Sequence, residues 1–201
     1  MLDGRYSNLN FTDEPGHIDL MVKHYPNGKA STYLHSLVQG ESLFFLAALR
    51  GYPWSPNKYS HVTLIAGGAG ITPMYQLIQG ILRNPDDRTK ITLVYGANTD
   101  EDLLFTKEFD EYEKRFSDRF NAVFVVTHPS KDSPFKKGYV SKALLEDAAG
   151  RPSEKKNTKV FICGPPAMEA ALVGDQGFRP RSGSIGILAE LGYSKDQIHK
   201  F

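Results

Sequence analysis

The chain has 201 residues, of which 40% are hydrophobic and 23% are charged, and its formal net charge at pH 7 is +1. This is an ordinary globular composition, and the length suits one medium domain or two small ones. The near-neutral charge argues against a general affinity for nucleic acid. The lone cysteine, Cys163, excludes an intramolecular disulfide, and the six histidines form no spaced pair suited to a metal, so we expect no metal site.

The sequence predicts no segment that spans a membrane or targets the chain. No apolar run approaches the ~18 residues that a membrane-spanning helix needs, and the most apolar stretch, residues 42–50, is short enough to be a buried strand. Residues 1–16 are polar and rich in turn formers, unlike a signal peptide or a mitochondrial presequence. We therefore expect the chain as given to be soluble.

Up to about residue 58 the pattern favours short strands. Residues 17–25 alternate apolar and polar side chains and precede a Pro-Asn-Gly turn, which predicts a strand. Residues 31–37 predict a short helix with Ser31 as its N-cap, and residues 41–49 predict a second strand. The first part of the chain is therefore expected to be mainly β.

After the proline-broken residues 51–60 the rhythm changes, so we expect a first domain over residues 1–58 and a second over residues 59–201. The strand-like segments of the second domain are 61–67, 90–97, 120–128, 159–165 and 197–201. The helix-like segments between them are 72–82, 101–116, 140–148, 166–172 and 187–192. Apolar strands separated by amphipathic helices predict a doubly wound α/β domain with a parallel five-stranded sheet.

Ligands of such sheets bind outside the carboxyl ends of the strands, where this chain has the turns 67–70 and 163–165. Both are rich in glycine or proline, and glycine lets a backbone approach a ligand. Thr72 and Pro73 fit an N-cap followed by proline at the first helical position, with free amides for a pyrophosphate. Pro73 departs from the usual dinucleotide fingerprint, so the alternative is a generic strand–helix turn.

Several motifs together resemble the ferredoxin-reductase-like family of flavoprotein pyridine-nucleotide reductases. The most specific are GGAGITPM (residues 67–74) and VFICGPPAM (residues 160–168), because the two turns occur as a pair. Residues 13–37 resemble the family's flavin-binding segment. Further matching segments are LVYGANTDEDLL (93–104), GYVSK (138–142) and LGYSKDQIHKF (191–201). The likeness is close to NADH–cytochrome b5 reductases of the fungal mitochondrial type.

This resemblance implies a partial antiparallel β-barrel that binds FAD, followed by an NADH-binding α/β domain. It implies that a hydride passes from NADH to FAD and that electrons then pass to cytochrome b5 or a similar haem protein. It also implies a place in the mitochondrial outer membrane or intermembrane space, with membrane attachment only through an N-terminal anchor that this chain lacks.

The resemblance also assigns site residues. For the NADH site these are Gly67, Gly68, Gly70, Ile71, Thr72, Pro73, Gly164, Pro165 and Met168. Within this site Thr72 and Cys163 would be catalytic, near the nicotinamide ring. For the FAD site they are Tyr6, Ser7, Lys23, Tyr25, Gly28, Lys29 and Ser31. The alternatives are a small buried cysteine at a strand end and an ordinary amphipathic hairpin.

Where the chain departs from the family, other functions stay open. It lacks about three initial strands, and Arg5 stands directly before Tyr6 without the family's prolines, so we expect little bound FAD. The alternatives are an NADH-binding module without flavin turnover and, less favoured, a short-chain dehydrogenase. Residues 127–135 offer no arginine for a 2′-phosphate, which predicts a preference for NADH over NADPH.

Overall fold

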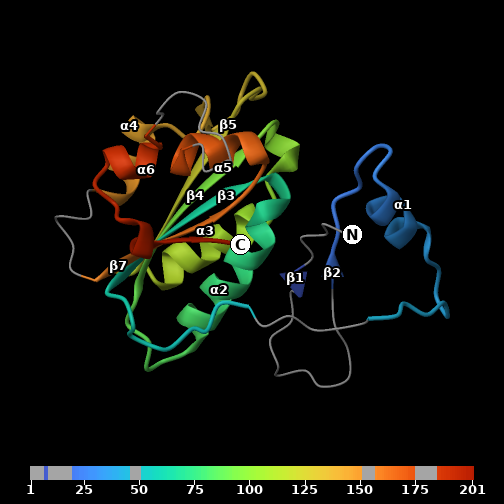
Figure 1. The fold of residues 1–201 in the computed structure, drawn as a ribbon, viewed down its shortest axis with the longest axis horizontal. Helices are drawn as coiled ribbons and strands as arrows, with labels where there is room; N and C mark the ends of the chain where they lie inside the picture. The colour runs from blue at the N-terminus through green and yellow to red at the C-terminus, as the bar shows by residue number, and fades with distance from the viewer. Residues whose placement is uncertain (1–6, 9–19, 46–50, 151–156, 175–184) are drawn as a thin grey trace.

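The computed structural model is described here for residues 7–8, 20–45, 51–150, 157–174 and 185–201. These residues contain a six-stranded parallel sheet in the order β6-β5-β4-β3-β7-β8 (Figure 1). Its strands are β3 (His61–Gly67), β4 (Lys90–Ala97), β5 (Phe120–Val126), β6 (Lys136–Lys137), β7 (Thr158–Cys163) and β8 (Ile198–Lys200). The predicted doubly wound α/β fold is therefore confirmed.

One strand, β6, was not predicted. Lys136 and Lys137 are exposed and pair with Val125 and Val126 at the edge of the sheet. Two charged residues give no apolar pattern, so the sequence does not reveal that they pair with β5 through the backbone. The sheet therefore has six strands where the sequence predicts five.

Helices cover both faces of the sheet, as the alternation of side chains along a strand requires. Leu64 of β3 packs in one core cluster and its neighbour Ile65 in the other. The Leu64 face is covered by α2 (Ile71–Arg83) and α3 (Thr106–Arg115). The Ile65 face is covered by α4 (Lys142–Ala149), α5 (Pro166–Val173) and α6 (Ile187–Glu190).

The N-terminal part lies beside α2 in Figure 1. Its described residues contain a two-stranded antiparallel sheet, β1 (Ser7–Asn8) with β2 (Leu20–Met21), and the helix α1 (Lys29–Ser36). Both strands are short, and antiparallel pairing agrees with the expected barrel type.

Two local predictions in this part are wrong. Residues 41–45 form no strand, and Phe44 is 85% exposed, because no described segment offers them a neighbouring strand to bond with. Residues 46–49 lie outside the described residues. The helix predicted from Ser31 begins two residues earlier, after Gly28, and Ser31 is buried in its first turn. There its hydroxyl accepts from the Tyr25 amide at 3.2 Å and donates to the Gly28 carbonyl at 3.2 Å.

The connecting segment, residues 51–60, packs onto the α/β domain. Trp54 and Tyr59 are partly buried against its core, and the Trp54 indole N–H donates to Asp87 Oδ2 at 2.9 Å. Asp87 is fully buried and also accepts from the Asn57 amide and from the amide and hydroxyl of Thr89. Burial raises its pKa, but these hydrogen bonds outweigh that effect and leave the pKa below its usual range. The domain boundary near residue 58 stays a prediction.

Among the helices of the described ranges, none has the length and apolar character required to cross a bilayer.

Candidate functional site

A cavity of about 580 Å³ lies at the carboxyl ends of β3 and β7. These two strands flank the point where the strand order reverses, since β4 and β5 lie on one side of β3 and β7 and β8 on the other. In open α/β sheets this is where ligands bind. Ten of the predicted site residues line the cavity: Lys23, Tyr25, Gly28, Lys29, Ser31, Gly67, Gly68, Gly70, Gly164 and Pro165.

The glycine loop after β3 and the Cys-Gly-Pro-Pro turn after β7 are packed directly against each other. A Cβ at Gly70 would collide with the Cys163 carbonyl group, and one at Gly67 would lie 2.7 Å from Pro165 Cδ. These two glycines are therefore needed for the close approach of the two turns. This packing explains why the two motifs occur together in the sequence.

Gly68 differs from its neighbours in the loop. Its φ is +51°, in the left-handed region, and a Cβ built on it would meet no other atom within 4 Å. It is therefore the loop glycine whose backbone is open to a ligand, and its conformation is one that side chains other than glycine adopt at a cost.

The helix after the loop begins earlier than Thr72-Pro73 predicts. A 3₁₀ turn over Gly68–Gly70 runs straight into α2, so Ile71 is the first helical residue. The Thr72 side chain is buried, and its hydroxyl donates to the Ala69 carbonyl at 3.0 Å. The N-cap prediction is wrong for this reason. Pro73 still lies in the first turn, where a missing N–H costs no intrahelical bond.

The two residues predicted to be catalytic lie behind the cavity lining. Cys163 is 1% exposed and ends β7, in register with Ala66 of β3. Thr72 is held against the loop backbone, as described above. Their catalytic roles stay predictions.

Other predicted residues also stand apart from the lining. Ile71, Pro73 and Met168 are not part of it, although the Met168 sulfur lies beside Gly67. Ser7 lies in β1, and Tyr6 falls outside the described residues.

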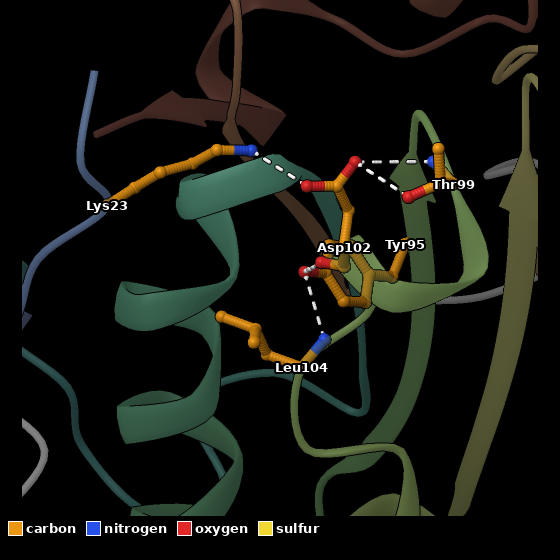
Figure 2. A network of polar contacts seen from close by, with 5 residues as sticks. All are labelled: Lys23, Tyr95, Thr99, Asp102 and Leu104. Carbon is orange, nitrogen blue, oxygen red and sulfur yellow. Dashed lines mark hydrogen bonds and ion pairs between the residues drawn. The ribbon is translucent and has the colours of Figure 1, made fainter. Parts of the chain in front are cut away.

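Sequence reasoning missed several lining residues, of which Asp102 has the most contacts. Its Oδ1 lies 3.1 Å from Lys23 Nζ, so an ion pair joins the N-terminal part to the α/β domain (Figure 2). Its Oδ2 accepts from the amide and hydroxyl of Thr99, at 3.3 and 3.1 Å. The Lys23 hydrogen bond is the main cause that holds the pKa of Asp102 below its usual range. Asn98, Ala30, Ala69 and Pro166 also line the cavity.

Tyr95 of β4 fixes the chain that follows Asp102. Its hydroxyl donates to the Asp102 carbonyl at 3.2 Å and accepts from the Leu104 amide at 3.4 Å (Figure 2). Burial raises the pKa of Tyr95 to about 12, so it keeps its proton at neutral pH. The continuous helix predicted over 101–116 is broken in the structure: a 3₁₀ turn ends at Asp102, and Phe105 has a φ of +61° before α3 begins.

The residues of the cavity fit an anionic dinucleotide. The open backbone at Gly68, in the 3₁₀ turn that leads into α2, suits a phosphate group, because no side chain blocks a close approach. Lys29 adds positive charge to the opposite wall, where the charge of Lys23 is already paired with that of Asp102. A volume of about 580 Å³ lies within the range of small-molecule and cofactor sites.

Two protein-family models match the chain. The oxidoreductase NAD-binding domain matches residues 64–173, and the oxidoreductase FAD-binding domain matches residues 4–49. The protein "NADH-cytochrome b5 reductase 2" of Aspergillus niger is 48% identical over 197 residues, which cover 98% of this chain and 61% of that protein. The protein of the same name from Pyricularia oryzae is 47% identical, with 98% and 59% covered. The chain thus spans about three fifths of the length of these relatives.

Solved structures agree with this assignment. The cytochrome b5 reductase domain of Ulva prolifera nitrate reductase superposes with a TM-score of 0.83 at 27% identity, over 98% of this chain and 78% of that one. The CS-b5R domains of human Ncb5or share the fold, with a TM-score of 0.72 at 23% identity and coverage of 98% and 55%. The predicted resemblance to flavoprotein reductases is confirmed. Since the NAD-binding model matches more than half of its residues, the chain belongs to the oxidoreductase NAD-binding domain family.

Proposed function

We propose that the chain provides the NADH site and part of the FAD site of an NADH–cytochrome b5 reductase. One observation carries the proposal: a single cavity has one wall from Lys23–Ser31 and another from the Gly67–Gly70 loop. The first segment matches the FAD-binding model and the second the NAD-binding model. Two cofactors bound to these walls would meet in the same cavity, as hydride transfer between them requires.

The chain's own residues would bind and orient the cofactors. The backbone of the Gly68–Gly70 turn would hold the pyrophosphate of NADH, and Gly164 and Pro165 would lie against its nicotinamide half. The segment with Lys23, Tyr25 and the Gly28–Ser31 turn would hold FAD. When bound, FAD supplies the acceptor for the two-electron hydride and releases electrons singly.

Thr72 and Cys163 would act through the backbone rather than by proton transfer. Thr72 secures the loop by its bond to the Ala69 carbonyl, and Cys163 ends the strand against which Gly70 packs. Their burial supports this role, since neither side chain lines the cavity. Both would position the residues that touch the cofactors.

The acceptor and the cellular location belong to the same proposal. The names of the relatives support a cytochrome b5-type haem protein as the electron acceptor. The motif resemblance to the fungal mitochondrial type supports the mitochondrial outer membrane or intermembrane space. Fractionation of cells with an antibody against the chain would test the location, and a chain found only outside mitochondria would contradict it.

The central test is reduction of added flavin. Because weak FAD binding is expected, the chain is used in large excess over FAD so that the flavin stays bound, and NADH is added without oxygen. We expect the absorbance of the bound flavin to bleach faster than that of the same amount of free FAD. A chain that binds NADH by calorimetry but leaves its bound flavin oxidised would instead be a nucleotide-binding module.

A further inference from the structure

A buried carboxylate lies behind the Cys-Gly-Pro-Pro turn after β7, and the proposed function assigns no role to it. Glu169 of α5 is 3% exposed, and its Oε1 accepts the amide N–H of Gly164 at 3.3 Å. Its Oε2 lies 2.9 Å from Nζ of Lys200. Burying a carboxylate is costly unless it is paired and hydrogen-bonded, and Glu169 meets both conditions.

The hydrogen bond from Gly164 to Glu169 lies where the chain is closely packed. Gly164 lines the cavity, and a Cβ built on it would lie 3.2 Å from the Gly67 amide nitrogen, across the contact between turn and loop. The Gly164 peptide therefore has little room to rotate, and its orientation is fixed where it faces the cavity. A charged acceptor aimed at this amide fixes the orientation of the peptide more firmly than a neutral one.

The second oxygen of the Glu169 carboxylate forms an ion pair with a lysine of the last strand. Lys200 belongs to β8, which pairs with β7 so that Lys200 lies opposite Ile162, two residues before Gly164. The Glu169–Lys200 pair thus connects α5, the turn after β7 and the C-terminal strand. A hydrogen bond alone would need only a neutral acceptor, whereas the ion pair also fixes α5 against β8.

We propose that Glu169, held by Lys200, is a positioning residue for the nicotinamide half of bound NADH. The inference rests on the proposed function, in which Gly164 lies against that half. It predicts that the loss of Glu169 weakens only the contacts to the nicotinamide half of NADH, and not those to its pyrophosphate or adenosine. ADP-ribose contains the pyrophosphate and adenosine of NADH but no nicotinamide, so it does not need the orientation of the Gly164 peptide.

The test compares the two ligands by calorimetry on Glu169→Ala, Glu169→Gln and Lys200→Met. For Glu169→Ala we expect the Kd of NADH to rise about tenfold and that of ADP-ribose to change by less than about twofold, as for the loss of one charge-assisted hydrogen bond. Glu169→Gln keeps an oxygen acceptor and should bind NADH within about threefold of the unaltered chain. The Kd of NADH for Lys200→Met should lie between those for Glu169→Ala and Glu169→Gln.

Lys195→Met is the matched control, because it removes an exposed lysine from the same C-terminal segment. Unchanged NADH binding in both Glu169→Ala and Lys200→Met would overturn the proposal, as would equal weakening of both ligands with a lowered Tm. If Glu169→Ala does not fold, Lys200→Met decides by the same comparison of NADH with ADP-ribose. An unaltered chain that binds neither ligand would contradict the proposed function itself, which keeps the two failures apart.

Discussion

The three glycines of the loop after β3 have different tasks. Gly67 and Gly70 have no room for a side chain because the Cys-Gly-Pro-Pro turn packs against them, whereas Gly68 has room but a left-handed backbone. Substitution at Gly70 therefore disturbs the fold, and substitution at Gly68 acts on the cavity.

We expect Gly68→Val to weaken NADH binding at least tenfold while the sheet stays folded. A left-handed conformation costs a residue with a Cβ roughly 1–2 kcal/mol, and the new side chain would occupy space open to the ligand. Calorimetry measures the Kd, and circular dichroism checks the fold. Gly70→Val is the contrasting variant: it should lose stability first, because its Cβ meets the Cys163 backbone. Normal NADH binding by Gly68→Val would exclude this loop as the phosphate site.

The sequence identifies site residues where their motif is local. The glycines and Lys23 lie in short recognisable segments, and the structure brings them to one cavity. Asp102 escaped prediction because its partner, Lys23, is 79 residues away. Thr72 was predicted as an N-cap because the sequence does not reveal that a 3₁₀ turn precedes it.

At the scale of elements, burial decides what the sequence can predict. The strands β3, β4 and β7 are mostly buried apolar runs between two helical layers, and β5 is apolar and partly buried, so their pattern is strong. The elements that were predicted wrongly depend on contacts with residues that are distant in the sequence. The helix expected over 101–116 is interrupted because Phe105 leaves the helical path and stacks on Tyr75, with ring centroids 4.0 Å apart.

Asp87 joins the connecting segment to the α/β domain, and we expect Asp87→Ala to be strongly destabilising. The change leaves the donors of buried Thr89, partly buried Trp54 and exposed Asn57 without their acceptor, at a cost of about 2–4 kcal/mol. Urea unfolding followed by circular dichroism measures the free energy. Asp86→Ala, at the exposed neighbour, keeps its backbone bond to Asn57 and should change little.

The same carboxylate predicts the direction of a pH effect. The pKa of Asp87 is lower in the folded chain than its ordinary value, so its stabilising contribution is present above the unfolded pKa. It is lost as the pH falls through the folded pKa. The difference in stability between the unaltered chain and Asp87→Ala should therefore shrink in acid, and a difference that grows in acid would contradict this assignment.

For the whole molecule, we expect NADH to bind more tightly than NADPH by about 1–2 kcal/mol, the worth of one missing charge-assisted bond. Asp100 follows β4, and its carboxylate accepts from Ser133 at 2.9 Å and from Ser130, both in the loop after β5. The Ser130 hydrogen bond is the main cause that lowers the pKa of Asp100. The family resemblance would place a 2′-phosphate near residues 127–135, to which Asp100 is bonded, so its carboxylate would repel one there.

Calorimetry with both nucleotides checks this preference. Asp100→Asn should reduce the difference in binding free energy between NADH and NADPH. Asp110→Asn is the control, since it makes the same charge change at an exposed position of α3. Equal dissociation constants for NADH and NADPH in the unaltered chain would contradict the prediction.

Trp54 gives the molecule a built-in optical reporter. It is the only tryptophan of the sequence, so all indole fluorescence of the chain comes from the connecting segment. Its N–H is bonded to the buried Asp87, and its ring lies 6.0 Å from that of Tyr59 and 6.4 Å from that of Phe161 in β7. A red shift of the emission would therefore signal that the segment has left the α/β domain. Because NADH absorbs where tryptophan emits, quenching without a shift and beyond the inner-filter loss from free NADH would signal bound nucleotide, so the emission spectrum would distinguish the two events.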